Sequence, residues 1–137
     1  MGRILGIDYG DRRVGLALSD PSGTLACALD VVEQSPRLWE VLRDVLAREE
    51  VERIVLGLPR NMDGTLGPKA RQVLAFKEKL EKECGAPVET WDERLTTAEA
   101  HEVLTIQGVS RSHRARVVDK VAAQILLQSY LDCRKLA

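Results

Sequence analysis

The stretch Ile4-Leu5-Gly6-Ile7-Asp8-Tyr9-Gly10 carries an apolar run straight into one carboxylate and a glycine turn. The run from Ile4 to Ile7 has no polar break, which is typical of a strand buried on both faces of a sheet. Asp8 ends this strand, and an ionised carboxylate at the edge of a core is costly unless a partner such as a metal ion compensates its charge. We therefore expect Asp8 to belong to a functional site.

Two further acidic positions accompany apolar sequence in the same way. Asp92-Glu93 comes directly after a second predicted buried strand, and Asp119 lies within an apolar C-terminal helix. Three separate segments that each bring an acid to the edge of a core predict one site built from carboxylates. Each acid also has a purely structural alternative: Asp8 caps a turn, Glu93 lies in a solvated loop beside Arg94, and Asp119 pairs with Lys120 or Arg116 on a wet helix face.

Length and composition narrow the class of protein. The 137 residues predict one domain, residues 1–137, that is long enough for a hydrophobic core. No window approaches the roughly 20 apolar residues of a membrane span, and the first residues do not resemble a signal peptide. The three cysteines, Cys27, Cys84 and Cys133, lack metal-binding spacing and are expected to be reduced. These features predict a cytoplasmic protein with no membrane partner.

The charge balance argues against generic binding to nucleic acid, because the net charge is only -1. Basic residues nevertheless stand beside each candidate acid, and the densest basic stretch, residues 110–116, leads directly into Asp119. These neighbours predict a local surface for a phosphate backbone, formed by Arg12, Arg94, Arg111, His113, Arg114, Arg116 and Lys120. Aromatic residues make up only 4% of the chain, so no surface for stacking bases is evident.

Periodicity predicts the order of the secondary structure. Strands are expected over 3–8, 14–20, 24–32, 53–58 and 88–91, where residues 14–19 alternate large and small in the pattern of a sheet. Helices are expected after a Ser35 N-cap with Pro36 at the first helical position, over 69–83, over 96–108 from a capping box, and from about 112 onwards. The apolar positions expected to face inward in three of these helices are Leu38, Val41, Leu42, Val45 and Leu46; Val73, Phe76 and Leu80; and Val118, Val121, Ala122, Ile125 and Leu126.

The resulting order, βββαβαβαα, predicts an α/β fold with a mixed five-stranded sheet. The first three strands form an antiparallel meander, and right-handed crossovers bring the last two parallel to the first, with helices on the faces. Sites in such sheets form at the carboxyl ends of the parallel strands. Asp8 and Asp92-Glu93 follow such ends, and small residues around Asp119 (Ala115, Ala122 and Ala123) would let its helix approach the sheet.

Carboxylates without zinc-type ligands indicate chemistry with hard cations. Mg²⁺ binds through one or two carboxylates plus substrate phosphates, and a pair of such ions stabilises both the attacking and the leaving oxygen in phosphodiester cleavage. His101 and His113 are isolated, and neither a P-loop nor a Gly-x-Ser-x-Gly motif is present. We therefore expect Mg²⁺ or Mn²⁺ as the cofactor.

Four motifs together resemble one known family across essentially the whole chain. They are Gly6-Ile7-Asp8-Tyr9-Gly10 with Arg13-Val14-Gly15-Leu16-Ala17-Leu18-Ser19-Asp20; Val55-Leu56-Gly57-Leu58-Pro59 with Met62-Asp63-Gly64-Thr65; Trp91-Asp92-Glu93-Arg94-Leu95-Thr96-Thr97; and Asp119-Lys120-Val121-Ala122-Ala123. The chain is similar to the YqgF/RuvX family, which has a ribonuclease H-like fold. That family is described as a nuclease that matures the 5′ end of pre-16S rRNA and, in other accounts, resolves Holliday junctions.

The resemblance implies catalytic and metal-binding roles for Asp8, Glu93 and Asp119. Related junction resolvases place an acid at the end of the fourth strand, where this chain has Leu56-Gly57-Leu58-Pro59. The second acid must therefore come from Asp92-Glu93; Glu93 is favoured because it is farther past the strand, and Asp92 remains the alternative.

Two other classes of protein compete with a nuclease. An Asp-Gly strand turn also opens the actin-like and sugar-kinase ATPases, but this chain is too short for their second lobe and second phosphate loop. A non-catalytic RNA-binding ribosome-assembly protein would not need three converging acids. The expected partner is therefore nucleic acid, with precursor rRNA ahead of branched DNA, bound by a monomer or weak dimer.

Overall fold

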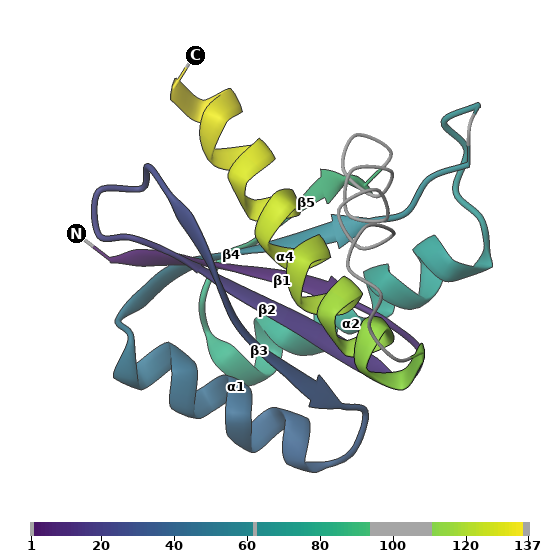
Figure 1. Ribbon diagram of the computed structural model, residues 1–137, viewed down its shortest axis with the longest axis horizontal. Helices are drawn as coiled ribbons and strands as arrows, with labels where there is room; N and C mark the ends of the chain where they lie inside the picture. Colours follow the sequence, from purple (N-terminus) through teal and green to yellow (C-terminus); the bar gives the residue numbers. More distant parts are fainter. Residues whose placement is uncertain (1, 62, 94–110, 136–137) are drawn as a thin grey trace.

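The computed structural model describes residues 2–61, 63–93 and 111–135, with the backbone alone for 111–117 and 135. The elements follow the predicted order: β1 Arg3–Tyr9, β2 Arg13–Ser19, β3 Ala26–Glu33, α1 Arg37–Arg48, β4 Val51–Leu58, α2 Pro68–Cys84, β5 Val88–Asp92 and α4 Arg111–Lys135 (Figure 1). The helix expected over 96–108 lies outside the described residues. No helix in the described part of the chain is long and apolar enough to cross a membrane.

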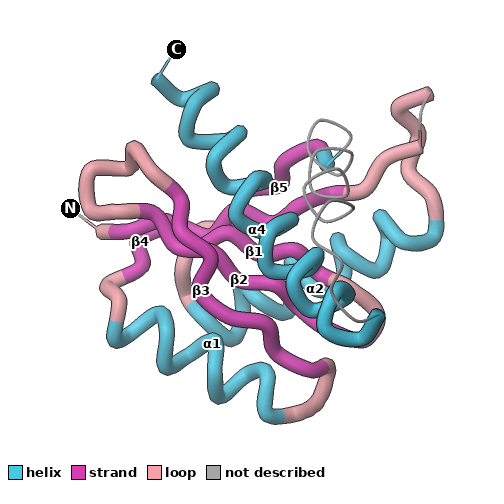
Figure 2. The backbone as a smooth tube through the Cα atoms, viewed as in Figure 1, coloured by secondary structure: helices cyan, strands magenta, loops and turns pink. Residues whose placement is uncertain are grey.

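The five strands form one mixed sheet in the order β3-β2-β1-β4-β5. β1 pairs antiparallel with β2, and β2 pairs antiparallel with β3, whereas β1–β4 and β4–β5 are parallel. Figure 2 shows these strands as a single twisted layer with helices on both sides. The predicted mixed sheet is confirmed, and the carboxyl ends of β1, β4 and β5 share one edge.

The two faces of the sheet are covered by different helices. α1 and α2 pack on one face over the larger core, which includes Leu5, Ile7, Leu16, Leu56 and Phe76. α4 packs on the other face over a smaller core that includes Ile4, Ala17, Val55 and Leu127. Neighbouring residues of β1 therefore belong to opposite layers, as the alternation of side chains in a strand requires. The same alternation holds in β2, where the predicted large and small faces are confirmed.

Glycines in the sheet let α4 come close to it. A Cβ built on Gly15 would collide with the backbone oxygen of Asp119, and a Cβ built on Gly6 would lie 2.8 Å from Cβ of Leu127. Ala123, fully buried, lies next to both contacts. The approach of helix to sheet thus depends on small residues on both partners, whereas the sequence pointed only to the helix.

Two details of the helices differ from expectation. The inward face of α4 carries Ala123, Leu126, Leu127, Tyr130 and Leu131, while Val118, Val121, Ala122 and Ile125 are only partly buried. Apolar residues occur on several sides of this long helix, so periodicity alone did not identify which side packs against the sheet. In α1 the cap residue is Pro36, without a side-chain hydrogen bond, so the expected Ser35 cap is wrong. The expected inward residues of α2 are all buried.

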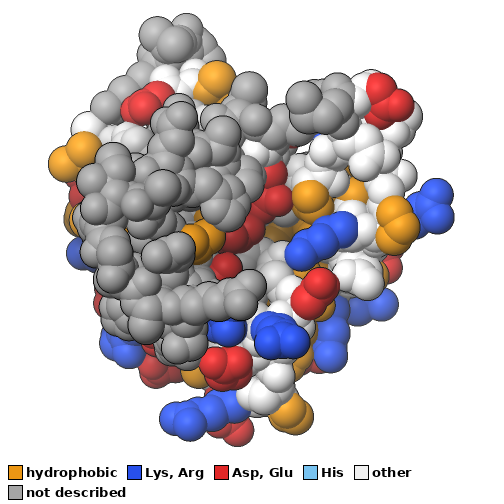
Figure 3. Space-filling model, turned by 45° about the vertical axis from the view of Figure 1, so that its right-hand side comes forward, with side chains coloured by type: hydrophobic (Ala, Val, Ile, Leu, Met, Phe, Trp, Pro, Cys, Tyr) orange, Lys and Arg blue, Asp and Glu red, His pale blue; other side chains and the backbone are white. Residues whose placement is uncertain are grey.

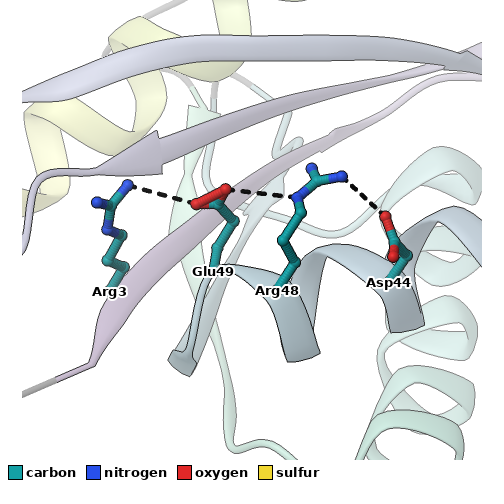
Figure 4. Close-up of polar contacts among 4 residues, drawn as sticks. All are labelled: Arg3, Asp44, Arg48 and Glu49. Atoms are coloured by element: carbon teal, nitrogen blue, oxygen red, sulfur yellow. Dashed lines mark hydrogen bonds and ion pairs between the residues drawn. The ribbon is translucent and has the colours of Figure 1, made fainter.

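The opposite edge of the sheet carries a surface network of ion pairs. Arg3 at the start of β1 contacts Glu49 at 3.5 Å, Glu49 contacts Arg48 at 3.5 Å, and Arg48 contacts Asp44 at 2.9 Å (Figure 4). Arg48 and Asp44 are more than half exposed, so solvent screens this pair and it contributes little to stability. This network lies at the far end of β1 from Asp8.

Candidate active site

Asp8 lies on the α4 face of the sheet, one residue before the end of β1. Its partner across β2 is Gly15, and the neighbouring pair Ile7–Leu56 places Gly57 of β4 on its other side. Asp8 therefore projects between two strands that carry glycine at the same level. The absence of side chains at both neighbours leaves room at this edge for groups that come from elsewhere in the chain.

Glu93 fills the space on the β4 side. The residue follows β5, and a Cβ built on Gly57 would lie 2.9 Å from Cγ and Cδ of the Glu93 side chain. The carboxyl group of Glu93 makes a side-chain hydrogen bond with Asp8. Glu93 thus reaches across β4 to meet an acid on β1, and the glycine between them makes that path available.

The protonation of Glu93 reflects this arrangement. Burial, followed by the hydrogen bond and charge of Asp8, raises the pKa of Glu93 from the ordinary 4.5 to about 9, although Lys69 opposes the shift. Two partly buried carboxyl groups in contact repel each other when both are charged. At neutral pH the Glu93 carboxyl is therefore favoured in its protonated form.

Asp119 reaches the same edge from α4. Nε of Arg13 donates a hydrogen bond of 2.8 Å to Oδ2 of Asp119, and each side chain is about one quarter exposed. Burial raises the pKa of Asp119, Arg13 lowers it, and the charge of Asp8 raises it again. Asp119 is therefore close enough to Asp8 for the two charges to interact, and Arg13 stabilises the Asp119 carboxylate.

The geometry separates Glu93 from Asp92. In β5, Trp91 packs into the α4 core, whereas Val88 packs on the α1–α2 side. Alternation therefore places Glu93 on the same face as Asp8, and Asp92 on the opposite face. The structure brings Glu93 to Asp8, and the charge of Asp92 raises the pKa of Glu93.

Two basic residues of the site were not selected from the sequence. Arg13 pairs with Asp119, and Lys69, in the first turn of α2, acts on the pKa of both Glu93 and Asp119. Nζ of Lys69 also lies 3.9 Å from Asp11. The alternation of side chains in β2 could have indicated Arg13, because it places Arg13 on the same face of the sheet as Gly15 and Ala17. The position of Lys69 depends on the loop after β4 and had no comparable signal.

The predicted phosphate-binding residues are only partly covered by the described residues. Arg12 is exposed in the turn after β1, and Lys120 is partly exposed one residue after Asp119. Arg94 lies outside the described residues, and so do the side chains of Arg111, His113, Arg114 and Arg116. Figure 3 shows acidic side chains gathered in a hollow, with Lys and Arg side chains along its margin.

The donor chemistry of the site fits a hard divalent cation. Within 2–61, 63–93 and the described side chains of α4, no three His, Cys, Asp or Glu residues are already grouped as metal ligands. Asp8 and Glu93, however, form a partly buried oxygen pair in which burial and the neighbouring carboxylate favour a proton on Glu93. A divalent cation would replace that proton, and Asp119 would join after releasing or sharing Arg13.

Comparison with known proteins places the chain in a family. The model of the family described as RuvX, Holliday junction resolvase, matches residues 2–133. A protein of Halothermothrix orenii is 48% identical over 132 residues, covering 95% of this chain and 94% of its own length. A protein of Symbiobacterium thermophilum is 48% identical over 134 residues, covering 96% and 93%. Both carry the name "Putative pre-16S rRNA nuclease".

Solved structures share the fold. RuvC of Thermus thermophilus in complex with a Holliday junction substrate matches with a TM-score of 0.60 at 22% identity, covering 100% of this chain and 98% of that chain. The Fowlpox virus resolvase with Holliday junction DNA matches with a TM-score of 0.57 at 11% identity, covering 96% and 98%. These likenesses confirm the ribonuclease H-like fold that the resemblance implied.

Proposed function

Because the chain belongs to the RuvX family of nucleases, we propose that it is a divalent-metal-dependent endonuclease that processes the 5′ end of pre-16S rRNA. The observation that carries this proposal is the Asp8–Glu93 pair, assembled across Gly57 at the carboxyl edge of the sheet. A protein that only bound RNA would gain nothing from two partly buried acids in contact, because they repel phosphate unless a cation balances them.

Three acids share the proposed metal site. Asp8 and Glu93 would hold Mg²⁺ or Mn²⁺ directly, and Asp119 would complete the ligand set. A bound cation would supply positive charge to the cleaved phosphate and to the attacking water. The chain's own contribution is to orient the carboxylates on two strands and one helix, and to hold Asp119 in place through Arg13 until the cation is bound.

The basic residues around the acids form the proposed contact with the substrate backbone. They are Arg12, Arg94, Arg111, Arg114, Arg116 and Lys120. Their charge would guide phosphates to the carboxylates although the net charge of the chain is -1. We place this activity in the cytoplasm, in residues 1–137 acting as one unit, as a monomer or weak dimer.

Resolution of four-way DNA junctions is the second candidate. The family description names Holliday junction resolvases, and two structural neighbours are bound to such junctions. Symmetric cutting of a junction needs two active sites in a stable two-fold dimer. Precursor rRNA ranks first because relatives at 44–48% identity carry the name "Putative pre-16S rRNA nuclease". In addition, a single active site is enough to cut one RNA strand.

The test compares both substrates in one experiment. Purified protein is incubated with a labelled pre-16S rRNA fragment or a four-way junction, in Mg²⁺, in Mn²⁺ and in a chelator. We expect metal-dependent cleavage of the RNA that is abolished by Asp8→Asn and retained in Asp44→Asn, which removes a surface charge at the far end of the molecule.

Metal binding is measured separately by thermal unfolding without nucleic acid. Mn²⁺ should raise the melting temperature of the native protein and of Asp44→Asn, but not of Asp8→Asn. Undiminished cleavage by Asp8→Asn would overturn the catalytic assignment. RNA binding without cleavage in any metal would indicate the non-catalytic alternative, and symmetric cutting of the junction alone, by a stable dimer, would reverse the order of substrates.

A further inference from the structure

A cavity of about 610 Å³ opens beside the end of β1, on the face of the sheet opposite the carboxylates. Tyr9 forms one wall, the segment from Gln34 to Trp39 at the start of α1 forms the second, and the part of α2 from Gln72 to Lys79 forms the third. The volume lies within the roughly 300–1,000 Å³ that is usual for small-molecule sites. The cavity is therefore large enough for one nucleotide.

The cavity concentrates the aromatic residues of the chain. Three of the five aromatic side chains line it: Tyr9, Trp39 and Phe76. The ring centroids are 4.3 Å apart for Tyr9–Phe76 and 5.5 Å apart for Trp39–Phe76. Phe76 is 7% exposed and belongs to the core, whereas Tyr9 and Trp39 are only partly buried. The low aromatic content gave no sign of such a cluster, yet the fold gathers three rings at one cavity.

Polar groups stand around these rings. The amide side chains of Gln34 and Gln72 line the cavity, and Nε2 of Gln34 is oriented by a 2.8 Å hydrogen bond to the carbonyl oxygen of Gly10. Amides both donate and accept hydrogen bonds, which suits the edges of nucleobases. Nζ of Lys79 lies over the ring of Trp39, 4.8 Å from its centroid, and places a positive charge at the wall formed by α2. A base that stacks on this face of Trp39 would displace the ammonium group, which a flanking phosphate could then bind.

The cavity adjoins the carboxylate site through two links. Tyr9 follows Asp8 directly, so the two side chains leave β1 on opposite faces of the same edge. Asp11, which also lines the cavity, ion-pairs with Lys69, the residue whose charge acts on Glu93 and Asp119. A nucleic-acid strand held at the acids would reach the aromatic rings by crossing the end of β1.

We propose that this cavity binds one unstacked base of the substrate strand close to the cleaved phosphodiester, with the base against Tyr9 and Trp39 and a flanking phosphate on Lys79. Unpaired bases are recognised by stacking on aromatic side chains and by hydrogen bonds to their edges. The cavity provides both, and therefore selects substrates with a single-stranded nucleotide next to the cut. This inference rests on the proposed nuclease function.

The experiment uses Asp8→Asn protein, so that the nucleic acid stays intact, with Trp91→Phe to leave Trp39 as the only tryptophan. A single-stranded fragment spanning the mapped cut should quench Trp39 fluorescence to saturation. Replacing each nucleotide in turn by an abasic one should abolish quenching at one or two adjacent positions, and weaken binding roughly tenfold there. If Trp91→Phe does not fold, the same quenching is sought as the difference between Asp8→Asn and Asp8→Asn/Trp39→Phe.

A lysine pair provides the matched control. Lys79→Gln should weaken binding severalfold and flatten its salt dependence, while Lys82→Gln, on the same helix outside the cavity, should leave both unchanged. Equal effects of all abasic positions, or no quenching, while the native protein still cleaves the fragment, would overturn the base site alone. Absence of both binding and cleavage would overturn the proposed function and the base site with it.

Discussion

The Glu93 side chain lies directly over Gly57, so that an acid from the end of β5 crosses β4 and meets Asp8 on β1. The sheet order β1-β4-β5 makes this crossing necessary, because β4 separates the two acidic strands. Any side chain at Gly57 would occupy the path. Related resolvases are expected to have an acid at the end of the fourth strand. This chain has Gly57 there, and Glu93, which follows the fifth strand, occupies the space above it.

Gly57→Ala should impair catalysis much more than folding. The added Cβ would collide with the carboxyl end of Glu93, which is flexible and can turn away, so the cost in unfolding free energy should stay below about 1 kcal/mol. Cleavage should fall by about tenfold or more, because a displaced ligand misplaces the reacting groups. Cleavage rates and urea unfolding measure the two effects. In the double variant Gly57→Ala/Glu93→Asp, the shorter acid relieves the collision, so the loss of cleavage should be smaller than the sum of the losses in the two single variants. A loss equal to that sum would contradict this account.

Glu93→Gln should stabilise the metal-free protein increasingly as the pH rises. The pKa of Glu93 is about 9 in the folded chain and near 4.5 when solvated, so the folded state binds the extra proton between these values. Stability contributed by the neutral carboxyl is complete below about pH 4.5 and is lost as the pH rises towards 9. Glutamine has no proton to lose. Melting temperatures of the native protein and the variant should therefore diverge across this range, whereas Glu78→Gln, an exposed change on α2, should follow the native curve.

Arg13→Gln should destabilise the fold more than an exposed arginine change does. Arg13 and Asp119 are 23% and 25% exposed and join β2 to α4 across 106 residues. Loss of the arginine leaves a partly buried carboxylate without its ion-pair partner, so the loss of stability should exceed that for a surface pair. Arg48→Gln, whose pair with Asp44 is 55% and 64% exposed, should cost less than about 0.5 kcal/mol. Urea unfolding gives both values, and saturating Mn²⁺ should reduce the deficit of Arg13→Gln, because a cation can take over the charge of Asp119. Equal costs for the two arginines would show that the pair has no structural role.

Gly15→Ala should be the most damaging of the glycine substitutions in the sheet. Its Cβ would collide with the backbone oxygen of Asp119, which cannot turn away as a side chain can. α4 would have to move off the sheet, at a cost of about 2–3 kcal/mol, and Asp119 would move with it. Circular dichroism during thermal unfolding measures the loss of stability, and cleavage at a temperature where the variant is folded measures the displacement of the acid. A variant with native stability would mean that α4 does not depend on this contact.

The order of strands and helices, the mixed sheet and the alternation in β2 followed from the sequence, because they depend on local periodicity and on the handedness of crossovers. The three acidic segments were found in the same way, since each follows or interrupts an apolar run. Their roles as ligands stay predictions that the metal and cleavage experiments test.

The tertiary structure decided which side chains meet. Glu93 rather than Asp92 faces Asp8 because the register of β5 on β4 assigns the two acids to opposite faces. The pairing of Arg13 with Asp119, the position of Lys69 and the gathering of Tyr9, Trp39 and Phe76 depend on how helices lie on the sheet. These contacts join residues that are far apart in the chain. Local pattern constrains the face on which a residue lies, but only the packed fold determines which residue lies opposite.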